Sequence, residues 1–286
     1  MFIIWIDDKH SIGIPEIDEQ HKQLFILTNQ IYDESQKEVK DRNLIPVLKR
    51  IYSYTNYHFS SEEGMFKKYG YAKYLSHISK HREFTQRLKV YLQDYRDKPN
   101  YTLDEPLDFM VDWIVTHIQG EDRVYADYFK AQGINPSIHF NSSDKSTKES
   151  ITEALSIWEK KKLQIENYTL DHQHKELVYI MQQIKDLQKA SSDRARMFLP
   201  SIIQKLFYYS QYHFSYEEEL MAKHNFENIL EHRELHQGFI LRIQDFAREY
   251  NLEKETLNTE MLQFLKEWVL THILDEDMKY KELLKD

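Results

Sequence analysis

Apolar residues recur every three or four positions along four stretches of the first half of the chain, which is the period of an amphipathic α-helix. An irregular arm over residues 1–17 precedes these stretches, and Asp18 stands where a residue would cap the first helix. The other three helices are expected at about 43–69, 74–95 and 103–129. Four amphipathic helices joined by short turns predict an up-down-up-down bundle, in which each helix is antiparallel to its neighbour.

The same pattern returns in the second half of the chain, which indicates a tandem repeat. Trp158 matches Trp5, and Asn225 stands at the position where Gly70 ends the second helix of the first half. A polar, turn-rich stretch separates the halves and predicts a linker. We therefore expect an all-α protein of two antiparallel up-down-up-down four-helix bundles in tandem, with domains at 1–135 and 151–286 and a linker at 136–150.

The composition excludes several classes of protein. Only six Gly and six Pro occur in 286 residues, which favours long helices. The formal net charge of −9 argues against nucleic-acid binding, because phosphates require basic patches. The absence of cysteine excludes disulfides, thiolate metal sites and iron–sulfur clusters. No stretch approaches the roughly 20 apolar residues of a membrane helix, and the N-terminus lacks the basic region of a signal peptide, so we expect a cytoplasmic protein without membrane contact.

A set of histidines and acidic residues keeps its spacing in both halves, with an offset of 153 positions at the first histidine and 155 at the later members. A duplicated fold would keep its apolar pattern, but it has no reason to keep polar residue types in register. The repeat therefore indicates one site in each half. Its candidate members are His21, His58, Glu62, His77, His81, His117 and Asp122, and in the second half His174, His213, Glu217, His232, His236, His272 and Asp277.

Residues four apart on a helix project from the same face. His58 and Glu62 form one such pair, and His77 and His81 form another on the next helix. With the two remaining histidines, each half presents five imidazoles and two carboxylates, which is too many ligands for one tetrahedral zinc ion. The set suits two ions that accept six ligands, such as iron, with bridging carboxylates.

The identity of the last carboxylate stays open at this level. Asp122 lies five residues beyond His117, whereas Glu121 lies four beyond and fits helical spacing better. The same choice arises between Asp277 and Glu276. Spacing alone favours the glutamates.

The chain resembles two hemerythrin domains of the bacterial type in tandem. The resemblance covers nearly the whole chain outside the linker, and the second half repeats the motifs, beginning at Leu170-Asp171-His172-Gln173-His174. In the first half it is carried by Ile17-Asp18-Glu19-Gln20-His21, Tyr54-Xaa-Xaa-Xaa-His58-Phe59-Xaa-Xaa-Glu62-Glu63, His77-Xaa-Xaa-Xaa-His81-Xaa-Xaa-Phe84 and Trp113-Ile114-Xaa-Xaa-His117-Ile118-Xaa-Xaa-Xaa-Asp122.

The resemblance implies two non-haem iron ions per domain, four per chain, bridged by oxide or hydroxide. It implies that three histidines hold one iron, that two hold the other, and that O2 binds at the open position of the second iron. It also selects the aspartate as the second bridging carboxylate. The implied assignments are His77, His81 and His117 for one iron, His21 and His58 for the other, and Glu62 and Asp122 as bridges; in the second half they are His232, His236 and His272, then His174 and His213, with Glu217 and Asp277.

Other residues near these motifs have two interpretations. Tyr54 and Tyr209 either touch the site or fill the core, and Trp113 and Trp268 either wall the ligand pocket or fill the core. Four histidines fall outside the pattern and are predicted on the surface: His10, His139, His172 and His224.

A donor set of mainly neutral imidazole favours reversible binding of O2 over oxidation, which carboxylate-rich di-iron sites support. We therefore expect oxygen storage, delivery or sensing, with O2 as the partner, and regard an enzyme as the weaker interpretation. The alternatives are a di-iron peroxidase or nitric-oxide-handling enzyme, and a module responsive to oxygen or iron. Such a module would need a separate, unidentified protein as its output.

Overall fold

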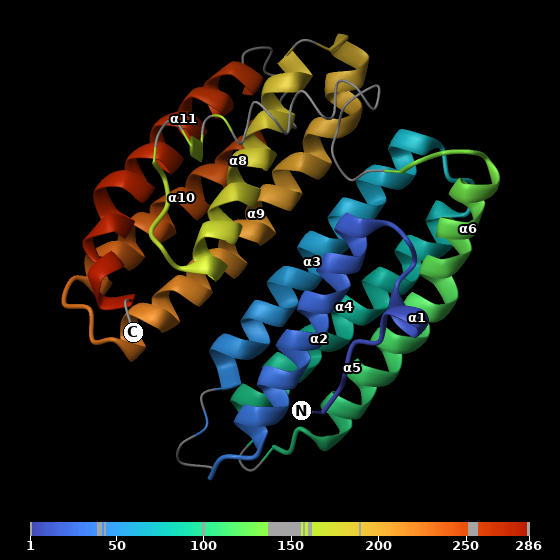
Figure 1. Cartoon of the computed structure of the whole chain (residues 1–286), viewed down its shortest axis with the longest axis horizontal. Coiled ribbons are helices and arrows are strands. Elements are labelled where there is room, and N and C mark those ends of the chain that lie inside the picture. Colours follow the sequence, from blue (N-terminus) through green and yellow to red (C-terminus); the bar gives the residue numbers. More distant parts are fainter. Residues whose placement is uncertain are drawn as a thin grey trace. The chain divides into compact units, whose positions relative to one another are not determined.

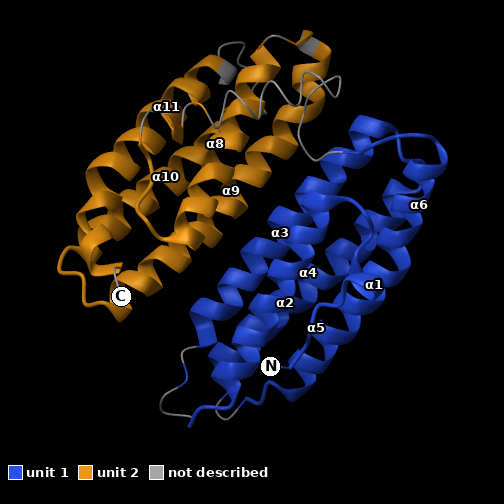
Figure 2. Cartoon of the chain, viewed as in Figure 1, with its two compact units in different colours: residues 1–138 blue, residues 139–286 orange. Residues whose placement is uncertain are grey.

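The computed structural model divides the chain into two compact units, Met1–Ile138 and His139–Asp286 (Figure 2). Within the described residues both units are built from helices, and no strand occurs. The predicted linker lies outside the described residues except for its first residue, so the domain limits of the sequence analysis stay predictions. The described residues are 2–38, 42, 44–98, 101–136, 156, 158–159, 162–188, 190–250 and 257–284.

The first unit is a four-helix bundle (Figure 1). Helix α2 packs against α3 and α5, and α3 packs against α4. The fourth helix consists of three continuous segments, because a turn of π-helix joins α5 to α6. The bounds are Pro15–Ser35 for α2, Leu44–Tyr69 for α3, Tyr74–Asp97 for α4, Asp104–His117 for α5, Ile118–Asp122 for the π turn η2 and Arg123–Ala131 for α6.

The second unit repeats this arrangement. Helix α9 packs against α8 and α10, and α11 packs against α8 and α10. Together the two units confirm the predicted all-α tandem of helical bundles. The bounds are Tyr168–Gln188 for α8, Ser192–Lys223 for α9, Ile229–Tyr250 for α10, Leu257–Thr271 for α11, His272–Glu276 for the π turn η3, Asp277–Lys279 for η4 and Lys281–Leu284 for η5.

The second helix of each bundle ends in the same backbone motif. Gly70 has φ +65° and Asn225 has φ 54°, both in the left-handed region. The next amide then reaches back to the last turn, with Tyr71 N to Phe66 O at 3.0 Å in the first unit. Glycine and asparagine are the residues that tolerate this conformation best, which explains the exchange between the two copies.

The N-terminal arm differs from the prediction in two ways. It contains a short helix, α1 (Asp7–His10), and α2 begins at Pro15, which suits the first position of a helix. Asp18 therefore lies inside the first turn of α2 and does not cap it. Its buried carboxylate accepts hydrogen bonds from Ser11 Oγ at 2.6 Å, Ile12 N at 2.8 Å and Gly13 N at 3.2 Å, so it ties the arm to the bundle.

The second unit keeps the main contact of this arm, because Asp171 accepts the Ile165 amide at 2.8 Å.

None of the described helices is long and apolar enough to cross a membrane.

Replacement of Asp18 by alanine should destabilise the first unit by roughly 2 kcal/mol, because three partly or fully buried donors lose their acceptor. Urea unfolding of the Asp18→Ala variant measures this. The adjacent Glu19→Ala is the control, since Glu19 makes only an exposed pair with Lys22 and should cost under about 0.5 kcal/mol. Equal unfolding free energies for the two variants would contradict the role given to Asp18.

Candidate metal centre

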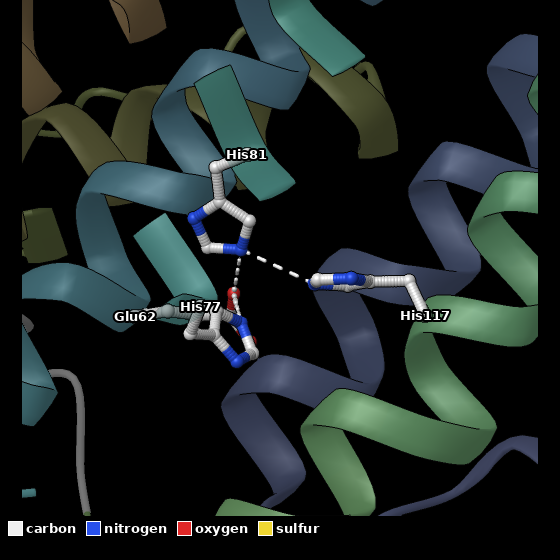
Figure 3. A group of neighbouring side chains, drawn as sticks. All are labelled: Glu62, His77, His81 and His117. Atoms are coloured by element: carbon white, nitrogen blue, oxygen red, sulfur yellow. Dashed lines mark hydrogen bonds and ion pairs between the residues drawn. The ribbon is translucent and has the colours of Figure 1, made fainter. Parts of the chain in front are cut away.

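All seven candidate side chains of the first unit are buried on the bundle axis. Figure 3 shows Glu62, His77, His81 and His117 pointing toward one another from α3, α4 and α5. Each of the four helices contributes at least one member, so the site forms only when the bundle closes. The contributions are His21 from α2, His58 and Glu62 from α3, His77 and His81 from α4, His117 from α5 and Asp122 from η2.

The ligand atoms of the first unit form two overlapping groups, each with its atoms within 4.8 Å of one another. One group joins Glu62 to His77, His81 and His117, and the other joins Glu62 to His21, His58 and Asp122. Glu62 belongs to both groups.

Asp122 lies between the two sets of histidines. Its Oδ2 lies 3.2 Å from His21 Nε2, and its Oδ1 lies 3.2 Å from His117 Nε2 and 3.3 Å from His77 Nε2. Each oxygen therefore faces a different set, which is the placement a bridging carboxylate requires.

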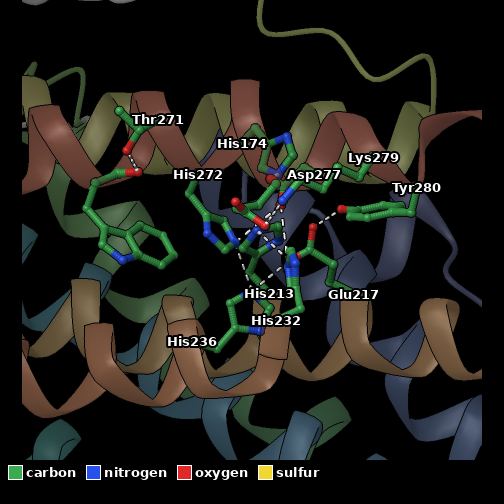
Figure 4. A network of polar contacts seen from close by, with 12 residues as sticks. His174, His213, Glu217, His232, His236, Thr271, His272, Asp277, Lys279 and Tyr280 are labelled. Atoms are coloured by element: carbon green, nitrogen blue, oxygen red, sulfur yellow. Dashed lines mark hydrogen bonds and ion pairs between the residues drawn. The ribbon is translucent and has the colours of Figure 1, made fainter. Parts of the chain in front are cut away.

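The second unit reproduces this geometry, as Figure 4 shows. Its groups are Glu217 with His232, His236 and His272, and Glu217 with His174 and His213. Asp277 again lies between the histidines, with Oδ2 3.3 Å from His174 Nε2 and Oδ1 3.2 Å from His272 Nε2. The structure thus brings together all fourteen predicted ligands, while their role in holding metal stays a prediction.

The π turn decides which carboxylate enters the site. In a π-helix residues five apart lie above one another, so η2 aligns Asp122 with His117. Glu121 lies outside the cluster and pairs with Lys80. In the second unit η3 does the same for Asp277, and Glu276 pairs with Lys279 at 2.6 Å. The preference for the glutamates from helical spacing was wrong, because it assumed a regular α-helix.

The donor atoms of the cluster fit cations. His21 Nε2, His77 Nε2, Glu62 Oε2 and both oxygens of Asp122 are buried without a hydrogen-bond partner among the described residues. The second unit leaves the same pattern at His174, His232, Glu217 and Asp277. In addition, the Nε2 atoms of His81 and His117 face each other at 3.2 Å. Buried polar atoms nearly always have a hydrogen-bond partner. Several nitrogen and oxygen atoms that converge without one, and that can bind metal, therefore indicate a position for a cation.

Contacts behind the ligands hold the imidazoles in orientation. Gln20 Oε1 lies 3.0 Å from His58 Nδ1, and Gln173 Oε1 lies 2.9 Å from His213 Nδ1. The amide group of Gln20 donates through Nε2 to Tyr57 Oη at 3.1 Å, so its oxygen faces the imidazole. The Nδ1–H group of His58 is thereby occupied and the Nε2 lone pair points into the cluster.

Aromatic rings fix two further imidazoles of each unit. Phe59 stacks on His81 with ring centroids 3.7 Å apart, and Phe214 repeats this on His236 at 3.8 Å. The half-buried Trp113 stacks on His117 at 4.1 Å, as Trp268 does on His272. Both tryptophans therefore cover a candidate ligand.

The predicted contact of Tyr54 and Tyr209 with the site has less support. Both are buried, and their described ring contacts are with Tyr57 at 5.4 Å and Tyr212 at 5.8 Å. Their role at the site stays a prediction.

Sequence reasoning missed Tyr125 and Tyr280. Tyr125 Oη donates to Glu62 Oε1 at 2.5 Å, and Tyr280 Oη donates to Glu217 Oε1. Each holds one oxygen of the shared glutamate and leaves the other facing the histidines. A signal was present, because both tyrosines lie three residues beyond the aspartate and keep the offset of 155.

The predicted surface position of His10 was wrong. His10 is buried, and its ring packs on Phe25 with centroids 5.0 Å apart. Its Nδ1 accepts the Ile6 amide at 2.9 Å. The corresponding residue of the second unit, at the offset of 153, is the buried Leu163. Of the other three unmatched histidines, His172 is exposed, His224 is half-buried and His139 lies outside the described residues.

Burial and neighbouring carboxylates shift the pKa values of several histidines in opposite directions. Burial lowers the pKa of His58 and His213 to about 3, so both are neutral and able to bind a cation. Burial also acts to lower the pKa of His236, but hydrogen bonds to Glu217 and Glu218 raise it to about 9. The pKa of His81 is raised in the same way. A cation that binds therefore displaces a proton in each unit.

The cation-free protein should be most stable near pH 6.5 to 7. An unfolded histidine has a pKa of about 6.5, so below this pH the unfolded state takes up protons that His58 and His213 refuse until about pH 3, and stability falls. Above pH 6.5 the folded state retains a proton on His236 until about pH 9, so stability falls again as pH rises through this range.

Urea midpoints at several pH values measure this profile. His236→Gln should remove part of the alkaline decrease, whereas the exposed His172→Gln should leave the profile unchanged. A midpoint that rises steadily to pH 9 would contradict the raised pKa of His236.

The π turn generates a second prediction. Asp122→Asn should weaken cation binding in the first unit by at least about tenfold, since even residues behind metal ligands contribute that much. Glu121→Gln should leave affinity within about twofold, because Glu121 pairs with Lys80 outside the cluster. Anaerobic titration with ferrous ion measures both, and the reverse order would place Glu121 in the site.

Both halves of the chain are similar to known proteins. The family model described as hemerythrin HHE cation binding domain matches residues 12–129 and 166–284. The bacteriohemerythrin of Clostridium acetobutylicum is 32% identical over 130 residues, which are 43% of this chain and 98% of that protein. That of Stenotrophomonas maltophilia is 30% identical over 129 residues, 45% of this chain and 82% of that protein. A hemerythrin-like protein of Naegleria gruberi is 32% identical over 118 residues, 41% of this chain and 85% of that protein. No solved structure matches.

Proposed function

The chain belongs to the hemerythrin HHE cation-binding family, and on that premise we propose that each of its two units binds O2 reversibly at a pair of non-haem iron ions. The observation that carries the proposal is the donor set, with five buried imidazoles and two buried carboxylates around two adjoining positions in each unit. Neutral nitrogen donors of this kind suit iron and stabilise its ferric state less than a carboxylate-rich set does. The names of the relatives, bacteriohemerythrin and hemerythrin-like protein, agree with this proposal.

The ligand roles follow from the two groups of atoms. In the first unit His77, His81 and His117 would hold one iron, and His21 and His58 would hold the other. Glu62 and Asp122 face both sets of histidines and would bind both ions, and the corresponding residues of the second unit would have the same roles. When bound, the iron pair supplies the electrons for O2 binding.

The side chains of the protein make the two iron positions unequal. One position receives three imidazoles and the other receives two, so the second position has one protein ligand fewer. O2 would bind at this open position. Gln20 keeps His58 directed inward, and Tyr125 keeps Glu62 in orientation, so neither ligand is free to turn and fill the open position.

Reversibility also requires that water be kept out. Three of the four residues of the layer one turn from the ligands are apolar and buried, namely Leu24, Phe84 and Ile114, and the fourth is Thr55. A dry site limits proton delivery to bound O2, and protons promote its irreversible reduction.

The direct test is an oxygen cycle on the whole chain. Anaerobic loading with ferrous iron should give about four irons per chain, and O2 should produce a visible absorption band that disappears when O2 is withdrawn. His58→Ala and His213→Ala should each leave one working unit, and we expect the two variants to differ in autoxidation rate.

Several outcomes would contradict the proposal. Iron that becomes irreversibly ferric, with turnover of added peroxide or nitric oxide, would favour the enzyme. A band that never reverses, without such turnover, would leave only a module responsive to iron. Two irons per chain would mean that one unit has lost its function.

A further inference from the structure

Two buried hydroxyl groups occupy matched positions in the bundles. Thr55 on α3 and Ser210 on α9 are separated by the offset of 155, and both are 0% exposed. The hydroxyl oxygens of both have no hydrogen-bond partner among the described residues. Buried hydroxyls are ordinarily paired, so two matched exceptions require an explanation.

Other serine and threonine hydroxyls in the bundles donate to the backbone of their own helix. A serine or threonine inside a helix usually donates to the carbonyl four residues earlier. Thr55 and Ser210 make no such bond among the described residues, so their hydroxyls are available to another acceptor. The comparison set is Thr28 to Leu24 O at 2.9 Å, Ser60 to Asn56 O at 2.7 Å, Ser61 to Tyr57 O at 3.1 Å, Thr85 to His81 O at 3.0 Å, Thr116 to Asp112 O at 2.6 Å and Thr271 to Glu267 O at 2.6 Å.

The antiparallel order of the helices places Thr55 in a defined layer. It lies three residues before His58 and seven before Glu62, so it shares their inward face and lies one turn beyond His58, away from Glu62. On each of the other helices, the residue three positions from the ligand histidine in the same spatial direction lies at the same level as Thr55. The resulting layer is Leu24, Thr55, Phe84 and Ile114, and in the second unit Leu177, Ser210, Phe239 and Val269, all buried.

The hydroxyl is the only polar side chain of this layer in each unit. It stands on the helix that carries His58, and that helix packs against α2, which carries His21. The hydroxyl lies one helical turn from His58, which belongs to the two-histidine position. This is the position with one protein ligand fewer.

We propose that Thr55 and Ser210 donate a hydrogen bond to a small ligand, O2 or an anion such as azide, held at the two-histidine position of their unit. This inference rests on the proposed function. A ligand at that position extends into the apolar layer, where its outer atom meets the unpaired hydroxyl as its hydrogen-bond donor. Without the ligand the hydroxyl has no hydrogen-bond partner, and with the ligand it has one. The contact therefore favours the liganded form.

The first experiment tests whether the hydroxyl has a structural partner. Thr55→Val keeps the shape of the side chain and removes only the hydroxyl, so the urea midpoint of the metal-free chain should be unchanged or higher. Thr28→Val is the matched control, because Thr28 is equally buried but its hydroxyl is paired with Leu24 O. A midpoint lower for Thr55→Val than for Thr28→Val would overturn the proposal.

The second experiment measures ligand binding directly. Azide affinity of the iron-loaded, oxidised chain should fall roughly 5- to 10-fold at one of its two sites in Thr55→Val, and at the other site in Ser210→Ala, the effect of one hydrogen bond. O2 release should quicken at the same site. Thr55→Ser should restore both values, and Thr28→Val should change neither.

The outcomes separate this inference from the function on which it rests. Unchanged azide affinity and O2 release in both variants would overturn the hydroxyl contact and leave reversible O2 binding intact. A weakened azide complex in a chain that does not release O2 would support the contact and reject the proposed function. Loss of affinity at both sites in a single variant would overturn the assignment of one hydroxyl to each unit.

Discussion

The structure depends on polar atoms that face one another in a buried space. Each bundle places five imidazoles and two carboxylates on its axis, where no water is available to solvate them. Burial of ionisable groups is unfavourable unless they are paired or bind a cation, and here several donor atoms have no partner among the described residues. A mostly apolar, buried layer lies one turn from these groups, and a cation would complete the arrangement.

The surroundings of the ligands are repeated as closely as the ligands themselves. In both units a glutamine faces the imidazole of the HxxxE motif, a tyrosine holds the shared glutamate, and aromatic rings stack on two histidines. These contacts orient His58, Glu62, His81 and His117, and their counterparts in the second unit. A helical bundle does not require these contacts. Their repetition therefore indicates that both halves of the chain need a defined ligand geometry.

The arm that precedes the first helix differs between the two units. Gly13 has φ +79° in the first unit, and Glu166 takes φ +65° at the corresponding position, where a side chain is strained. His10 is replaced by Leu163 against the same helix. The first helix carries His21 in one unit and His174 in the other, so the arms differ beside matched candidate ligands. This is one physical origin for a difference in behaviour between the sites.

The sequence by itself determined the class of fold, the repeat and the set of candidate ligands. Amphipathic periodicity and scarce Gly and Pro are local properties, and matched spacing of His58, His77 and their partners needs no coordinates. The tertiary structure decided the features for which local sequence rules gave the wrong prediction. A π turn aligns Asp122 with His117, and regular helical spacing cannot represent that extra residue. Asp18 binds the folded-back arm instead of capping its helix, and His10, which belongs to that arm, is buried against Phe25. The partner of Tyr125 lies on another helix, and the hydroxyl of Thr55 has no partner among the described residues, so the surroundings of both depend on which helices meet in the closed bundle.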